Sequence, residues 1–246
     1  MEIQEPSGAQ RAESHPTYPF WGYKDMAIFL GAVIPAFLAS QGLVLLLRQV
    51  SAPSRAVEAL AGQFLLYGML FYFLVALFRV RHGRDFWESM SWRASERGVA
   101  ASLAWGPPLA IAVLAASAFL RTPNVENPIQ KLLEGWFSIL LVGVFATTAA
   151  PLCEELLFRG FIMPLLCRSF GAVPGMVITA AAFAVMHGPM YSWSWRHIAL
   201  IGLAGLAFGW IRYRTGSTAA ATAIHASYNL TFFLTFVIVE GGKIEW

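Results

Sequence analysis

Three short polar motifs interrupt the apolar runs of this sequence. They are E-E-x-x-x-R at 154–159, F-x-x-x-H at 183–187 and H-x-x-x-N at 225–229. Of the 14 acidic residues, only Glu154 and Glu155 fall deep inside an apolar run. An ionisable side chain inside such a run is costly to bury, so each is a candidate for function. The candidate site residues are therefore Glu154, Glu155, Arg159, His187, His225 and Asn229.

Helix geometry separates the two adjacent glutamates. Glu155 and Arg159 are four residues apart, so on a helix they share a face and can form an ion pair. Glu154 is rotated by about 100° from Glu155, which leaves its carboxylate free for another role. We therefore expect Glu155 and Arg159 to be structural or substrate-orienting, and Glu154 to be available for chemistry.

The spacing of the polar residues from two expected turns predicts that they meet. Glu154 lies 17 residues before a turn near Gly171 and His187 lies 16 residues after it. At the rise of an α-helix, both are roughly 24–26 Å from that turn. His225 and Asn229 lie roughly 15 and 21 Å from a second turn near Thr215 by the same rise. Four polar side chains from three helices should therefore converge at similar depth.

Such a set of side chains would suit peptide hydrolysis by an activated water. A carboxylate and an imidazole can act as a general base on water. A second imidazole and an amide can stabilise a developing oxyanion. A serine mechanism has less support, because neither Ser217 nor Ser227 lies in a G-x-S-x-G context. Paired aspartates within the apolar runs and an H-E-x-x-H motif are also absent from the sequence.

The composition indicates the elements that must position these residues. The chain has 246 residues, of which 57% are hydrophobic and 13% charged, with a mean hydropathy of +0.59. A soluble domain averages about 25% charged residues, and a single soluble core cannot hide so much apolar surface. We therefore expect an integral membrane protein, and disordered, collagen-like and disulfide-scaffold classes are excluded. The net charge of +3 reflects arginines at membrane edges and does not indicate a nucleic-acid partner.

The apolar runs predict an all-α, polytopic membrane helix bundle. Backbone polar groups in lipid must be satisfied internally, which favours helices. We expect about seven transmembrane helices, or eight if the fourth run breaks near Pro151. The runs fall at 27–47, 59–78, 99–120, 136–168, 173–188, 198–211 and 217–239. The whole chain, 1–246, is read as a single transmembrane domain with an N-terminal tail at 1–26 and a catalytic helix core at 136–239.

Basic residues predict the orientation of the bundle. The 79–98 loop holds five arginines, which places it in the cytosol together with the N-terminus. A multi-pass protein of the plasma membrane is expected. The stretch 85–98 predicts an interfacial helix, with Asp85 and Glu88 as a capping box. Its Phe86, Trp87, Met90 and Trp92 would lie at the headgroup boundary. The aromatic cluster at Tyr18–Tyr23 predicts a second interfacial belt.

Taken together, the three motifs resemble the CPBP family of intramembrane proteases, which includes the CAAX prenyl endoproteases and the abortive-infection proteins. The resemblance covers about residues 136–235, and its sharpest element is E-E-x-x-x-R followed by Gly160 and Phe161. It implies that Glu154 is the general base on the catalytic water and that His187 shares this water. It also implies that His225 and Asn229 form the oxyanion site, while Glu155 with Arg159 orients the helix or meets substrate.

The resemblance also implies a partner and bears on cofactors. The substrate would be a membrane-anchored or lipidated protein or peptide, and the other partner is the lipid bilayer. No cofactor and no metal is expected. Zinc held by Glu154, His187 and His225 is the alternative, but no paired metal motif fixes these three residues as ligands.

Two other functions stay open at this point. The first is a non-catalytic membrane scaffold or immunity-type binding protein of the same fold. The second is a proton-coupled transporter that uses Glu154 and His187 as a relay. The lack of an inverted repeat in the sequence disfavours the transporter.

Overall fold

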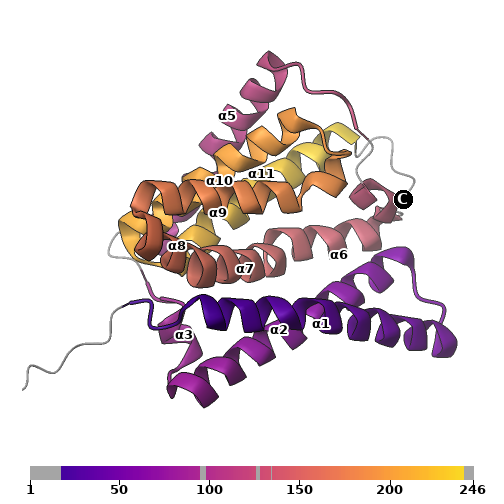
Figure 1. Cartoon of the computed structure of the whole chain (residues 1–246). Coiled ribbons are helices and arrows are strands. Elements are labelled where there is room, and N and C mark those ends of the chain that lie inside the picture. The colour runs from indigo at the N-terminus through magenta and orange to yellow at the C-terminus, as the bar shows by residue number, and fades with distance from the viewer. Residues whose placement is uncertain (1–17, 95–97, 126–127, 134, 241–246) are drawn as a thin grey trace, which may run out of the picture.

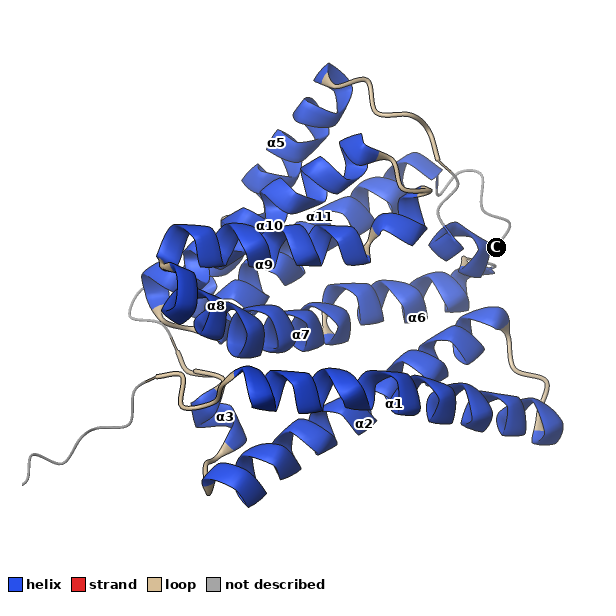
Figure 2. Cartoon of the chain, viewed as in Figure 1, coloured by secondary structure: helices blue, strands red, loops and turns tan. Residues whose placement is uncertain are grey.

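The structure is a computed structural model that describes residues 18–94, 98–125, 128–133 and 135–240. Within these ranges every regular element is helical and no strand occurs, as Figure 2 shows. The prediction of an all-α, polytopic helix bundle is thereby confirmed. The expected tail at 1–26 falls largely on residues 1–17, which lie outside the described ranges.

Three layers make up the molecule (Figure 1). A helix pair, α1 (Tyr23–Val50) and α2 (Arg55–His82), lies on one side, and α5 (Gly106–Phe119) lies on the other. Short α3 (Phe86–Ser89) and α4 (Val99–Leu103) link these two layers along the chain. The central layer comprises η1 (Pro128–Leu132), α6 (Gly135–Thr147), α7 (Ala149–Glu155), η2 (Leu156–Ile162), α8 (Met163–Phe170), α9 (Ala172–Met186), η3 (Gly188–Tyr191), α10 (Trp195–Thr215) and α11 (Thr218–Glu240).

The last helix, α11, is the hub of the central layer. It packs against α4, α5, α6, α7 and α10. Close approach depends on small residues, because a Cβ added to Gly106 would collide with Ser227 and the backbone of Tyr228. A Cβ on Gly143 would likewise collide with the ring of Phe233. Small residues thus seat α5 and α6 directly on α11, where two of the candidate site residues lie.

Five helical segments among the described residues are long and apolar enough to cross a membrane. They are Tyr23–Val50, Arg55–His82, Val99–Phe119, Gly135–Phe170 and Thr218–Val239. Five of the seven predicted crossings therefore have the length and composition of a membrane span, and the total number stays a prediction. Of the other two, α10 has 21 residues, whereas α9 has only 15 and rises about 22 Å. The fourth run is interrupted at Thr148, yet α6 and α7 continue in the same direction in Figure 1.

The two predicted turns lie where the spacing argument placed them. Gly171 separates α8 from α9 with a φ of 90°, and Gly216 ends α10 with a φ of 63°. Both backbone conformations favour glycine, since a Cβ is disfavoured at positive φ. The turns of the antiparallel α8–α9 and α10–α11 hairpins therefore lie at the same end of the bundle, as expected.

The predicted interfacial helix at 85–98 is wrong in extent. Asp85 does cap a helix through the backbone N–H of Glu88 at 3.0 Å, but that helix ends at Ser89. The side chains of Phe86 and Met90 are buried in the core, with Met90 packed over Gly160. The segment covers the end of the central layer, so Phe86 and Met90 bury against protein instead of lipid, whereas Trp87 is 49% exposed. Residues 95–97 of the predicted helix lie outside the described ranges.

The aromatic cluster before α1 is also more buried than its sequence suggests. Trp21 is fully buried between Phe78 and Phe161, and its indole N–H donates to the carbonyl of Phe161 at 3.1 Å. This hydrogen bond satisfies the one polar atom of the ring, so the ring can enter the core. The N-terminal segment is thus fastened to the central layer before the first helix begins.

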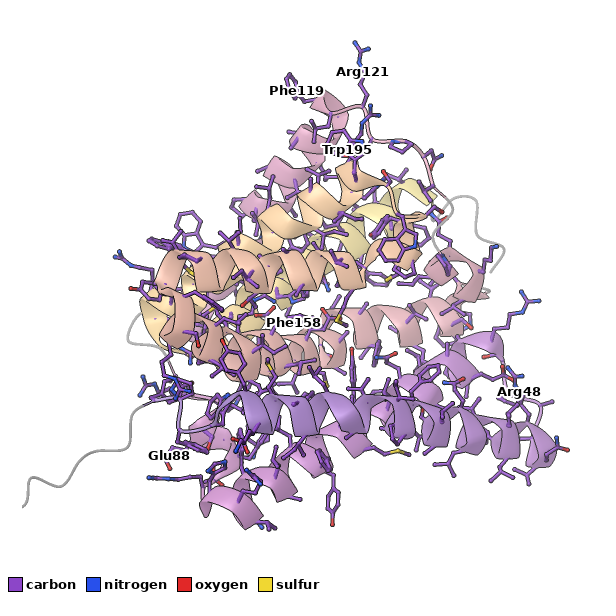
Figure 3. The ribbon with its side chains drawn as sticks, viewed as in Figure 1. Arg48, Glu88, Phe119, Arg121, Phe158 and Trp195 are labelled. Carbon is purple, nitrogen blue, oxygen red and sulfur yellow. The ribbon has the colours of Figure 1, made fainter. Side chains whose placement is uncertain are left out.

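One end of the bundle gathers arginines. Arg81 pairs with Asp25 at 2.8 Å, and Arg168 donates to the backbone carbonyls of Pro19 and Trp21. In Figure 3 Glu88 lies at this end, whereas Arg48 lies at the opposite end. We call it the arginine-rich end. By the distribution of basic residues it is the predicted cytosolic side, and that orientation stays a prediction.

Candidate active site

The E-E-x-x-x-R motif lies where regular α-helix gives way to π-helix. Helix α7 ends at Glu155, and residues Leu156–Ile162 form the π-helix η2, which contains Arg159. A π-helix is rare and often marks a functional site. No pattern in the sequence predicted it.

A buried polar cluster forms around Glu155. Its Oε1 accepts from Nη1 of Arg159 at 2.8 Å and lies 2.9 Å from Nδ1 of His225. The side chains of Glu155 and Arg159 are both fully buried. The predicted ion pair is therefore confirmed. The contact with His225 adds a link from the end of α7 to α11 that residue spacing alone did not reveal.

Arg159 also anchors α10 and the aromatic core. Its Nη2 donates to the carbonyl of Gly205 at 2.7 Å. Its guanidinium lies 4.6 Å from the ring centroid of Phe183 and 5.5 Å from that of Phe208. Cation–π contacts of this kind stabilise a buried cation. Arg159 therefore holds three helices around the cluster, which explains Phe183 of the F-x-x-x-H motif as a packing residue.

Glu154 lies outside the Glu155–Arg159 ion pair, as helix geometry predicted. Its side chain is 21% exposed, and its Oε2 lies 3.8 Å from Nε2 of His225. Two carboxylates therefore flank the two sides of one imidazole ring. Glu155 is buried in a fixed network, whereas Glu154 opens onto a cavity.

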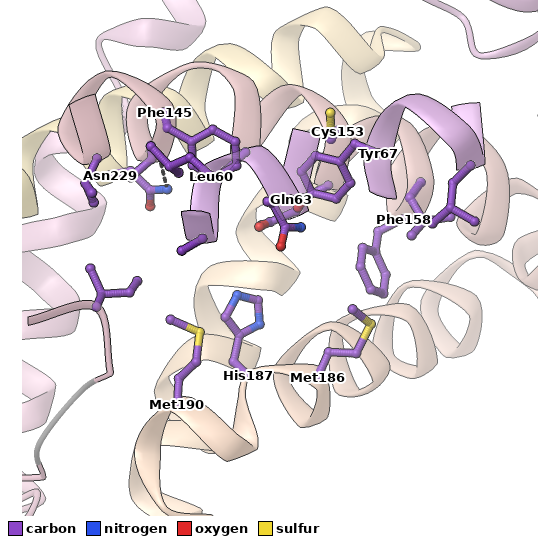
Figure 4. Close-up of a pocket in the computed structure, with 18 of the residues that line it drawn as sticks. Leu60, Gln63, Tyr67, Phe145, Cys153, Phe158, Met186, His187, Met190 and Asn229 are labelled. Carbon is purple, nitrogen blue, oxygen red and sulfur yellow. Dashed lines mark hydrogen bonds between the residues drawn. The ribbon is translucent and has the colours of Figure 1, made fainter. Parts of the chain in front are cut away.

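His187 sits at the end of α9 as its C-terminal cap. Its Nδ1 lies 2.8 Å from the carbonyl oxygen of Phe183, which can only accept. Nδ1 therefore carries a hydrogen, and in the neutral ring Nε2 keeps a free lone pair. Figure 4 shows the ring directed into the cavity, on the side facing Gln63.

Asn229 joins α11 to the break between α6 and α7. Its Nδ2 donates to the carbonyl of Ala146 at 2.8 Å. Ala146 belongs to the last turn of α6, where backbone carbonyls lack partners within the helix. Asn229 is thus a helix–helix contact residue. A second N–H on the same amide nitrogen remains for another acceptor.

The four predicted catalytic residues line one cavity. A region of about 400 Å³ between α6, α10 and α11 is lined by Glu154, His187, His225 and Asn229 among apolar and aromatic side chains. A neighbouring region of about 430 Å³ extends toward α2 and shares Glu154, His187 and Asn229 with the first. The structure therefore brings the four together, and the polar groups lie where two apolar arms meet.

Helix α2 contributes two residues that the sequence reasoning missed. Gln63 and Tyr67 line the arm that reaches α2 (Figure 4). The first three runs are rich in Leu and Phe, which favoured a purely peripheral role for them. Gln63 is nevertheless a polar residue inside the apolar run 59–78, and that signal could have marked it.

The donor set does not fit a zinc ion. Among the residues that the structure describes, no group of three His, Cys, Asp or Glu side chains has the arrangement of a metal site. We therefore derive no step through a metal, and the expectation of no cofactor stays a prediction.

Comparison with known proteins identifies the helical core. Residues 135–231 match the family described as type II CAAX prenyl endopeptidase Rce1-like. No curated protein and no solved structure matches the chain. The matched region runs from α6 into α11 and contains all six candidate site residues. Over this core, the chain is similar to the CAAX-type family of membrane proteases.

Proposed function

We propose that the protein is a glutamate-type intramembrane endopeptidase in which Glu154 is the general base on a water molecule. The observation that carries this proposal is the convergence of Glu154, His187, His225 and Asn229 on one otherwise apolar cavity. Glu154 is partly exposed to that cavity, whereas the adjacent Glu155 is sealed in an ion pair. A carboxylate that reaches water in an apolar surrounding is suited to proton abstraction.

His187 shares the same water through Nε2. Because Nδ1 donates to Phe183, the neutral ring presents an acceptor to the cavity. Glu154 and His187 would then accept the two hydrogens of one water and direct its oxygen lone pair at a carbonyl carbon. The proton taken up at Glu154 is available for the leaving amine as the peptide bond breaks.

His225 and Asn229 form the oxyanion site in this proposal. The Nδ1–H of His225 is committed to Glu155, so donation from Nε2 to an oxyanion requires the doubly protonated, cationic ring. Asn229 supplies its second N–H. Glu155 and Arg159 act as positioning residues, because they fix the orientation of the imidazole.

The substrate class follows from the family and from the shape of the cavity. The family name refers to CAAX prenyl substrates, so we propose a prenylated, membrane-associated protein or peptide. The arm toward α2 is lined by apolar side chains such as Leu70, Phe71 and Leu157. Such walls suit a lipidated chain that enters from the bilayer.

Substitution of Glu154 by glutamine tests the proposal. The purified chain is assayed on a prenylated fluorogenic peptide in detergent or liposomes. Loss of the general base should lower kcat by about 10²–10⁴-fold while the fold is retained. Glu58→Gln is the matched control, because Glu58 pairs with Arg48 at the opposite, exposed end. Cleavage by Glu154→Gln at the wild-type rate would refute the proposed role.

A further inference from the structure

A second polar cavity lies at the arginine-rich end. It has a volume of about 430 Å³ and is lined by Arg84, Arg93 and Arg212 together with Glu88. None of its lining residues borders the active-site cavity. Three guanidinium groups thus face a single carboxylate. These charged residues take no part in the proposed proteolysis, so their excess of positive charge needs a separate explanation.

Arg212 is the buried wall of this cavity. It is only 6% exposed, and its Nε and Nη2 donate to the hydroxyls of Thr218 and Tyr18, each at 3.0 Å. Both partners are neutral. Among the described residues no carboxylate forms an ion pair with it. A buried cation in a protein is usually paired with an anion, whereas the described hydrogen-bond partners of Arg212 are neutral.

Two further arginines surround the mouth. Arg93 is exposed and is held by a hydrogen bond from Nε to the carbonyl of Gly216 at 3.3 Å. Arg84 lies over the ring of Phe20 at 5.8 Å. The hydroxyl of Ser91 also lines the cavity and donates to Tyr18 at 3.1 Å. The arginines therefore come from the 84–93 region and from α10, which are distant in sequence, and the fold holds them around one space.

We propose that this cavity binds the phosphoryl group of an anionic membrane lipid. Arginine presents a planar fork of donors that matches phosphate oxygens, and charge-assisted hydrogen bonds are the strong ones. The cavity lies at the end of the bundle, where α2 and α10 terminate. Headgroup phosphates of a surrounding bilayer would be at this level.

An adjoining groove favours a lipid over a free phosphate. Gly216 lines both the arginine cavity and a groove bordered by Trp105 and Trp210. That groove continues over the apolar surface of α5 and α10. The two tryptophans are 62% and 49% exposed, as expected for side chains that meet acyl chains. A phosphoryl group held by the arginines could thus place its acyl chains along the groove.

Binding to the full-length protein in detergent tests the proposal with three probes. They are dioctanoyl phosphatidylglycerol, inorganic phosphate and uncharged dioctanoylglycerol. The variant is Arg93→Gln, and the matched control is Arg79→Gln, which removes one exposed arginine near the same end but outside the cavity. Loss of one charge-assisted hydrogen bond should weaken phosphatidylglycerol binding about tenfold in Arg93→Gln. Arg79→Gln should bind like the wild type.

The outcomes separate the sources of the phosphoryl group. Binding of phosphatidylglycerol alone, dependent on Arg93, supports a lipid site as proposed. Arg93-dependent binding of inorganic phosphate with equal affinity would overturn the lipid assignment in favour of a free anion. An equal loss of phosphatidylglycerol affinity in Arg93→Gln and Arg79→Gln would overturn a specific site in this cavity. The general positive charge of the surface would then explain the binding. Equal binding of dioctanoylglycerol by wild type would overturn any role for phosphate.

Discussion

Replacing Glu155 with glutamine removes the charge that two buried groups share. Glu155 and Arg159 are fully buried, and His225 contacts the same carboxylate oxygen. Removing one partner of a buried ion pair typically costs about 3–5 kcal/mol, because the other charge is left uncompensated. For a chain of this size each kcal/mol lowers the melting temperature by about 2–4 °C. We therefore expect Glu155→Gln to melt roughly 6–20 °C below the wild type.

The double variant Glu155→Gln with Arg159→Met separates charge from packing. It removes the stranded cation, while the methionine can keep contact with the rings of Phe183 and Phe208. The hydrogen bond to the Gly205 carbonyl is lost, which costs about 1 kcal/mol and the penalty of an unpaired carbonyl. The double variant should nevertheless be more stable than Glu155→Gln alone.

Thermal unfolding of the purified protein, followed by tryptophan fluorescence, measures Glu155→Gln, Arg159→Met and the double variant. Glu58→Gln is the exposed control, since it breaks an ion pair of 2.6 Å whose arginine is 51% exposed. Such surface pairs contribute about 0–1 kcal/mol. If the two single substitutions add in the double variant, the charges of Glu155 and Arg159 are not coupled, and the reasoning is refuted.

Two further predictions concern the packing around Arg159 and the metal-free mechanism. Gly205→Ala should destabilise the protein by up to about 2 kcal/mol, because overpacking outweighs the gain in helix propensity. The new Cβ would lie 3.2 Å from Arg159 and Phe183, whereas Gly202→Ala meets only Ala184 at 3.6 Å and should be neutral or stabilising. Melting temperatures that shift in the same direction would contradict this contrast. Chelation with EDTA and a zinc-selective chelator should leave peptide cleavage unchanged, whereas activity lost on chelation and restored by zinc would contradict the metal-free proposal.

Local features of the site were predictable from the sequence because helix geometry is local. The Glu155–Arg159 pair follows from a four-residue spacing, and the outward direction of Glu154 follows from rotation per residue. The turns at Gly171 and Gly216 combined with the rise per residue to bring Glu154, His187, His225 and Asn229 to one depth. These features depend on spacing along the chain and not on the identity of the neighbouring helix.

The partners of these residues required the tertiary structure. His225 meets Glu155 across 70 residues, and Asn229 meets the Ala146 carbonyl across 83 residues. Those contacts depend on how α11 is rotated against α6 and α7, which periodicity does not determine. Met90 and Trp21 were misplaced at the membrane interface for the same reason, since hydrophobicity alone does not distinguish a lipid neighbour from a protein neighbour.

The sequence by itself thus determined that the chain crosses a membrane as helices and that those helices carry a few polar residues. Both conclusions depend only on composition and on the spacing of residues along one helix. Only the tertiary structure decided that α2 contributes Gln63 to the cavity, that a π-helix carries Arg159, and that one carboxylate is sealed while its neighbour opens onto the cavity. Those features arise from packing between segments far apart in the chain, where contact geometry and not local pattern sets the energy.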